Sequence, residues 1–171
     1  VATATHRKVI DDALTHAVPD VRVAALRAIG RTQRAEFLPK AIAELSNPSI
    51  DVRREAAFAV AHIGSGAPAA FAPAETALRD ALGRETDMLV CAALAEEYGR
   101  LPFPAAAEVD AAAQTLRGLL TRLGREGSVA PIIELGAARG AEALARRAAR
   151  LDADRERGSG GERESGVGSR E

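Results

Sequence analysis

The sequence contains, at residues 51–64, the stretch Asp51-Val-Arg-Arg-Glu-Ala-Ala-Phe-Ala-Val-Ala-His-Ile-Gly64. A similar stretch, Asp20-Val-Arg-Val-Ala-Ala-Leu-Arg-Ala-Ile-Gly30, lies 31 residues before it. In both, aliphatic residues and alanines recur at every third or fourth position, which is the spacing of one face of an α-helix. Self-similarity at a fixed period of this size indicates a solenoid of stacked units. We therefore expect an all-α fold built from repeated helices.

Each repeat is predicted to be a pair of helices. A turn separates the two helices of a pair, at 18–20 in the first copy and at 46–49 in the second. Both turns contain proline, which disfavours helical geometry in the residue before it, followed by a residue that starts helices well. A third, degraded copy lies 38 residues after the second. The inward positions of the three second helices are then Val21, Ala25 and Ile29; Val52, Ala56, Val60 and Ile63; and Val90, Leu94 and Tyr98.

The repeats define one domain, at residues 1–151. Its units are expected at 5–33, 35–64 and 74–101, with a divergent unit at 105–151. In that last unit we predict a long helix at 105–125, a short one at 129–135 and a third at 141–151. Residues 152–171 consist almost entirely of polar residues and glycine, which cannot bury a core, so we predict a disordered tail.

The second helices share the pattern Val-Arg-x-x-Ala-x-x-x-Ile/Val, preceded by Asp and followed by Ile-Gly. This pattern resembles HEAT repeats, most closely the short bacterial repeats named after phycobilisome lyases. The resemblance implies a short right-handed α-solenoid of about four antiparallel helix pairs, whose second helices line a concave face. It also implies that Arg22 and Arg53 form a ladder between neighbouring repeats. Cys91 stands at the third equivalent position, so the ladder is expected to end there.

Composition and charge exclude several classes of protein. The net charge of −1 provides no field that would attract nucleic acid or an anionic membrane. One cysteine cannot form an intrachain disulfide, and no apolar run is long enough for a transmembrane helix. The chain begins with Val, so we expect a fragment of a longer protein. The resemblance to the short bacterial repeats implies a bacterial protein of the cytoplasm or periplasm. A peptidyl-prolyl isomerase domain outside the fragment is one candidate for the remainder.

The outward side of the second helices supplies the candidate binding residues. At about 100° per residue, Arg54 and Phe58 lie nearly opposite the inward positions. Arg27 and Glu96 occupy the corresponding places in the first and third copies. An outward aromatic residue is typical of an anchor in a protein interface, although packing against a neighbouring helix or residues 65–73 is the more common role of such a residue as Phe58. We predict a protein or peptide partner that contacts Arg27, Arg54, Phe58 and Glu96.

No residue pattern points to catalysis, a metal or a cofactor. His6, His16 and His62 lack the spacing of a helical metal pair. The adjacent carboxylates Glu96 and Glu97 diverge by about 100° on a helix, so they do not converge on one substrate atom. We therefore expect a protein that is not an enzyme.

Two other functions remain as alternatives. Chromophore handling similar to that of bilin lyases would recruit Arg53, Arg54 and Tyr98 to hold a linear tetrapyrrole. Nucleic-acid binding similar to that of HEAT-like alkylpurine glycosylases would need a basic concavity with aromatic residues. The near-zero charge and the absence of tryptophan argue against the second alternative.

Overall fold

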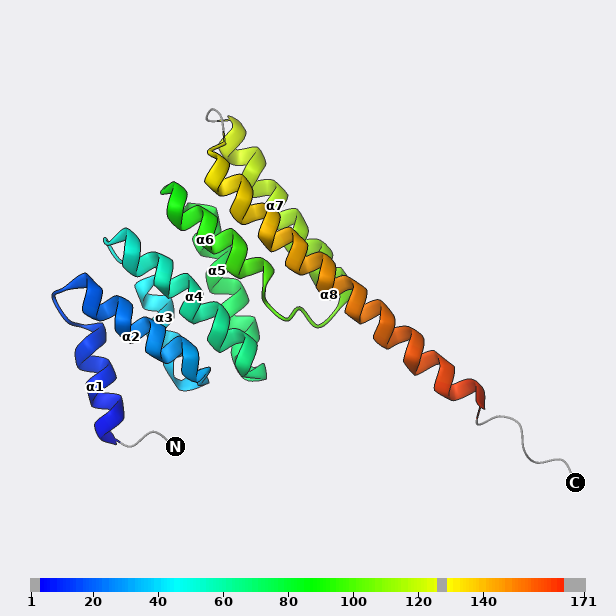
Figure 1. The fold of residues 1–171 in the computed structure, drawn as a ribbon, viewed down its shortest axis with the longest axis horizontal. Coiled ribbons are helices and arrows are strands. Elements are labelled where there is room, and N and C mark those ends of the chain that lie inside the picture. The colour runs from blue at the N-terminus through cyan, green and yellow to red at the C-terminus, as the bar shows by residue number, and fades with distance from the viewer. Residues whose placement is uncertain (1–3, 126–128, 165–171) are drawn as a thin grey trace, which may run out of the picture.

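The computed structural model describes residues 4–125 and 129–164, which form helices and no β-strand (Figure 1). The all-α class predicted from the sequence is therefore confirmed. None of the described helices is long and apolar enough to cross a membrane. In chain order the elements are α1 (Ala4–Leu14), α2 (Pro19–Thr32), the 3-10 turn η1 (Ala35–Phe37), α3 (Leu38–Glu44), α4 (Ile50–Gly66), η2 (Pro68–Ala70), α5 (Phe71–Arg84), α6 (Met88–Gly99), α7 (Ala106–Arg125) and α8 (Pro131–Glu164).

The helices stack in two rows. Helices α2, α4, α6 and α8 lie side by side in a front row, and each contacts the next (Figure 1). Helices α3, α5 and α7 lie behind them, and α1 packs against α2 at the N-terminal end of the stack. Each front helix follows its rear partner in the chain, so the described residues form an α-solenoid of helix pairs.

The core lies between the two rows and is built largely from alanine and aliphatic residues. On α4 the inward positions are completely buried, because the rear helices α3 and α5 cover them. Alanine at these positions allows the helix backbones to approach closely. The predicted register of the second helices is confirmed by the burial of Val52, Ala56, Val60 and Ile63 in α4, of Ala25 and Ile29 in α2, and of Val90, Leu94 and Tyr98 in α6. Val21, at the start of α2, is half-buried.

Side chains in the turns fix the starting points of the front helices. The carboxylate of Asp87 accepts hydrogen bonds from the backbone N–H groups of Leu89, at 2.9 Å, and Val90, at 3.1 Å, and so caps α6. The side-chain oxygen of Asn47 accepts a bond from the N–H group of Ser49, at 2.9 Å, just before α4. Such bonds satisfy N–H groups that have no partner within the helix.

The predicted break near residue 136 is wrong, because α8 is one continuous helix from Pro131 onward. Glycines at the predicted break allow close packing of α8 against α6. A Cβ atom at Gly136 would stand 2.3 Å from the carbonyl oxygen of Ala92, and one at Gly140 would stand 2.4 Å from that of Ala95. A Cβ atom at Gly99 would likewise stand 2.3 Å from the carbonyl oxygen of Gly140. These contacts cover the outward side of α6, which the sequence suggested would be open.

The predicted boundary of the tail at residue 152 is also corrected. Helix α8 continues to Glu164, and residues 165–171 lie outside the described part of the chain. Extending a helix that is already packed avoids the cost of nucleation, and ion pairs at i, i+3 support the extension. Asp152 pairs with Arg155 and Asp154 pairs with Arg157 in this way. A polar composition therefore did not prevent helix formation here.

Candidate partner-binding groove

Arg53 links the second helix pair to the third. Its Nε donates to the Oε2 atom of Glu85 at 2.8 Å, and its Nη1 donates to the carbonyl oxygen of Asn47 at 2.9 Å. Burial alone would raise the pKa of Glu85, but hydrogen bonds from Arg53 and from the N–H groups of Asp87 and Thr86 outweigh it and lower that pKa. Arg53 thus holds the turn before its own helix and the turn between α5 and α6 together.

Arg22 makes the corresponding contacts one repeat earlier. Its Nε donates to the carbonyl oxygen of His16 at 2.7 Å, and its Nη1 lies 3.5 Å from the carboxylate of Glu44 at the end of α3. The carbonyl acceptor stands six positions before the arginine in both repeats. Each arginine therefore binds the carbonyl oxygen six positions before it, and each also reaches a carboxylate of the next repeat.

At the third equivalent position a thiol and a distant arginine replace the ladder arginine. Cys91 Sγ lies 3.5 Å from the carbonyl oxygen of Glu85, again six positions earlier. Arg122 of α7 donates to the carbonyl oxygens of Leu82, at 2.8 Å, and Glu85, at 3.4 Å. Burial raises the pKa of the Cys91 thiol to about 11, so the thiol is protonated and unreactive at neutral pH. The sequence did not indicate that α7 would supply a guanidinium group here.

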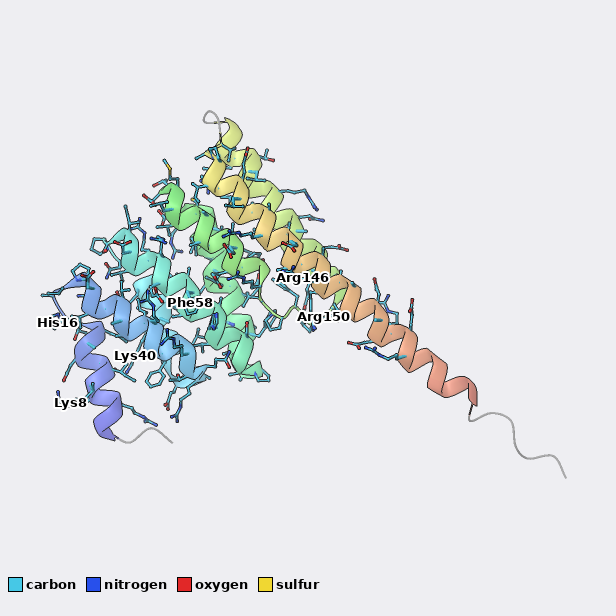
Figure 2. All side chains as sticks on the ribbon, viewed as in Figure 1. Lys8, His16, Lys40, Phe58, Arg146 and Arg150 are labelled. Carbon is cyan, nitrogen blue, oxygen red and sulfur yellow. The ribbon has the colours of Figure 1, made fainter. Side chains whose placement is uncertain are left out.

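A groove of about 500 Å³ lies on the exposed side of the front row. Residues of three successive front helices line it, and Figure 2 places Phe58 on α4 in the middle of that row. We call it the front groove. Its lining consists of Asp20, Val23, Arg27 and Arg31 from α2, Asp51, Arg54, Glu55 and Phe58 from α4, and Ala93 and Glu97 from α6.

The structure brings Arg27, Arg54 and Phe58 together in the front groove. Arg27 donates to both carboxylate oxygens of Glu55, at 3.2 and 2.8 Å, and Arg54 donates to Asp51 at 3.3 Å. Both guanidinium groups therefore already have carboxylate partners, and about half of each side chain is exposed.

Phe58 is half-buried, and its ring lies against an imidazole. The ring centroids of Phe58 and His62 are 3.9 Å apart, with an angle of 31° between the ring planes. Burial and the nearby Arg100 lower the pKa of His62, which favours a neutral imidazole at this position. Phe58 therefore presents an aromatic surface to a groove that is otherwise lined mainly by charged side chains.

Glu96 lies outside the front groove. Its carboxylate pairs with Arg100 and with Arg139 of α8, the latter at 3.2 Å. Because α8 packs beside α6, this side of α6 is an internal boundary between helices rather than an open surface. The sequence did not show which helix would cover Glu96.

Glu97 is a groove residue that the sequence analysis did not predict. It is 7% exposed, and its Oε1 atom accepts a hydrogen bond from Nη1 of Arg100 at 2.8 Å. No group among the described residues donates to its Oε2 atom, which is buried. Burial, opposed by Arg100 and reinforced by Glu96, raises the pKa of Glu97 to about 7.

A signal for Glu97 was present in the repeats. The register of 31 and 38 residues aligns it with Ala28 and Ala59. Ala59 is completely buried, whereas Ala28 is exposed. A carboxylate that replaces alanine at such a position indicates a site where one repeat differs from the others in chemistry.

The described residues contain no group of three or more His, Cys, Asp or Glu side chains that would hold a metal ion. His16 accepts a hydrogen bond from the N–H group of Val18 through Nδ1, at 3.1 Å, and His62 packs on Phe58. The side chain of His6 lies outside the described residues.

Comparison with known proteins gives one result that bears on identity. Neither the curated proteins nor the solved structures include a match to the chain. A family model described as "HEAT repeats" matches residues 7–99, which is more than half of the chain and spans α2 to α6 completely. Together with the two-row stack of helix pairs, this match shows that the chain belongs to the HEAT-repeat family.

Proposed function

We propose that the chain is a non-catalytic protein- or peptide-binding module that holds its partner in the front groove. HEAT repeats commonly mediate protein interactions. The short period of 31 residues between the first two copies further suggests repeats of the phycobilisome-lyase type. Neither point identifies a partner, so the proposal depends on the groove itself.

The observation that carries the proposal is the position of Phe58 in a groove formed by three repeats. Anchors of protein interfaces are typically aromatic residues surrounded by contacts that exclude water. Phe58 is half-buried on His62, so binding would cover the remainder of the ring without first reordering a flexible side chain. Its neighbours Arg27 and Arg54 are held by Glu55 and Asp51.

The charges of the groove favour a protein partner over nucleic acid. Its lining contains four carboxylates and three arginines, and carboxylates already pair with two of the arginines. A nucleic-acid surface requires several unpaired cations to neutralise phosphates. The front groove therefore suits a chain that carries both charged and apolar groups.

Selection of displayed twelve-residue peptides on the immobilised protein would test the proposal. Peptides that bind should lose about tenfold or more in affinity with Phe58→Ala, because truncating an aromatic anchor typically costs about 2 kcal/mol. Val9→Ala is the matched control, since Val9 is an exposed apolar residue on α1, away from the groove. Selected peptides that bind Phe58→Ala and the wild type equally well would contradict the proposal.

A further inference from the structure

The front groove contains a carboxyl group with one unpaired oxygen. The side chain of Glu97 is 9% exposed and lines the groove on α6. Its Oε1 atom is engaged by Arg100, whereas none of the described residues donates to Oε2. A buried acceptor without a donor costs free energy, and a ligand that brings a donor recovers it.

We propose that the front groove accepts a lysine side chain of a protein partner, whose ammonium group donates to Oε2 of Glu97. This inference rests on the proposed function, because it names the partner group that the groove recognises. The carboxylate would then be paired on both oxygens, with Arg100 on one and the partner's lysine on the other.

The geometry of the carboxyl group favours lysine over arginine. A guanidinium group binds a carboxylate best through two parallel hydrogen bonds, one to each oxygen. Arg100 already occupies Oε1, at 2.8 Å. One free oxygen suits an ammonium group, which acts as a compact point charge with rotatable donors.

The walls of the groove suit the apolar stem of a lysine. Phe58 and Ala93 line the groove with Glu97. Lysine side chains commonly pack their methylene groups along apolar surface while the ammonium group reaches a polar partner. The length and narrowness of the stem allow the charge to reach a carboxyl group that is covered from bulk water.

The charges around Glu97 also favour a cation. Glu55 on α4 contributes to the raised pKa of Glu97, which shows that the two carboxylates repel each other. Glu96, on the same helix, acts in the same direction, while Arg100 opposes both. Most cations from neighbouring front helices are already paired, Arg27 of α2 with Glu55 and Arg139 of α8 with Glu96. Arg54 of α4 pairs with Asp51. Asp20 and Arg31 of α2 line the groove as well, but neither acts on the pKa of Glu97.

The charged groups on the rear helices and His62 of α4 do not act on the pKa of Glu97. On the rear helix α5, Glu75 accepts a hydrogen bond from the Tyr98 hydroxyl group at 2.9 Å and pairs with Arg79. On α7, Arg122 binds carbonyl groups at the opposite end of α6. His62 of α4 has a lowered pKa, so it is neutral above pH 6.5.

Binding should therefore depend on pH in a defined direction. The pKa of Glu97 is about 7 in the free protein. An ammonium group stabilises the ionised carboxylate, so binding releases a proton from Glu97 when the pH lies below that value. The affinity for a lysine side chain should increase as the pH rises from 6 to 8.

The test uses the full chain, immobilised, and three pools of seven-residue peptides. The pools are degenerate in neutral residues and carry lysine, arginine or norleucine at the central position, and the retained peptide is quantified by mass spectrometry. Norleucine has the apolar stem of lysine without its charge. We expect the wild type at pH 8 to retain the lysine pool about tenfold over the norleucine pool, a factor equal to one hydrogen bond to a charged group.

Variants distinguish the lysine assignment from the more general proposal that the front groove binds peptides. Glu97→Gln should bring the ratio of lysine to norleucine close to one. Glu142→Gln is the control and should leave the ratio unchanged, because Glu142 is an exposed carboxylate on α8 outside the groove. Equal retention of the lysine and norleucine pools, a preference for arginine, or a lysine preference that survives Glu97→Gln would overturn the lysine assignment. If, in such a case, Phe58→Ala abolishes retention of the pools, the front groove binds peptides without a preference for lysine, and the proposed function stands. Retention that Phe58→Ala does not alter would overturn the groove as well.

Discussion

Arg53 and Glu85 form a 2.8 Å ion pair across the boundary between the second and third helix pairs. The two side chains are 16% and 10% exposed, so water screens their attraction only weakly. A solenoid is stabilised by contacts between neighbouring repeats, and this pair is one of the polar contacts among the described repeats. It also fixes the turn that positions α6 beside α4.

Removing this pair should destabilise the protein. Arg53→Ala leaves the largely buried Glu85 with only backbone donors, and we expect a loss of about 2–3 kcal/mol in the free energy of unfolding by urea. The loss should shrink at acid pH, because the lowered pKa of Glu85 means that its stabilisation disappears as pH falls through that pKa.

Arg79→Ala is the control for Arg53→Ala. It removes an exposed i, i+4 pair with Glu75, and it should cost at most about 0.5 kcal/mol. Equal losses for the two variants would show that the pair between repeats has no special role in stability.

Glu97 should make the stability of the free protein decrease with pH. An unfolded chain releases the Glu97 proton near the ordinary pKa of 4.5, whereas the folded chain keeps it up to about 7. Between these values the folded state binds more protons, so the free energy of unfolding falls as pH rises. At pH 8 the accumulated loss is about 3 kcal/mol at most.

Urea unfolding of Glu97→Gln at pH 5 and pH 8 checks this expectation. The variant keeps the shape of the side chain without an ionisable group. It should match the wild type closely at pH 5 and exceed its stability at pH 8. A difference between variant and wild type that is the same at both pH values would contradict the raised pKa of Glu97.

The contact between α6 and α8 should not tolerate a methyl group at Gly140. Its Cβ atom would stand 2.4 Å from the carbonyl oxygen of Ala95, so Gly140→Ala must push the helices apart, at a cost of about 1–3 kcal/mol. Thermal unfolding should show a fall in Tm of about 2–4 °C for each kcal/mol.

Gly118→Ala is the matched control on α7. A Cβ atom there meets no atom within 4 Å, and alanine is favoured over glycine inside a helix by about 0.5–1 kcal/mol. The control should therefore raise Tm. A rise for Gly140→Ala as well would mean that α8 does not pack against α6 at the distance seen here.

The repeat pattern predicted most of the fold because it reports burial directly. Val52, Ala56, Val60 and Ile63 recur at helical spacing, and all four are completely buried. The pattern did not predict α8 as one helix, because the repeat register does not extend into residues 131–164. In the structure, glycine is required at 136 and 140 because the backbone of α6 lies close to both positions. The spacing of residues in the sequence does not encode that contact.

The candidate site was predicted only in part for a related reason. The helical period placed Arg27, Arg54 and Phe58 on one side, and these residues line the front groove. It placed Glu96 on that side as well, but α8 covers Glu96, and Glu97 lines the groove instead. A terminal helix without sequence similarity to the repeats thus decides which carboxylate faces the groove.

The most direct test of the central claim is to map a bound peptide by NMR. A peptide selected on the protein should perturb backbone amide signals at Val23, Phe58 and Ala93, which belong to three successive repeats and line the front groove. The rear helices α5 and α7 should show little change. Perturbations confined to the rear helices, with the signals of Val23, Phe58 and Ala93 unmoved at saturation, would contradict the account.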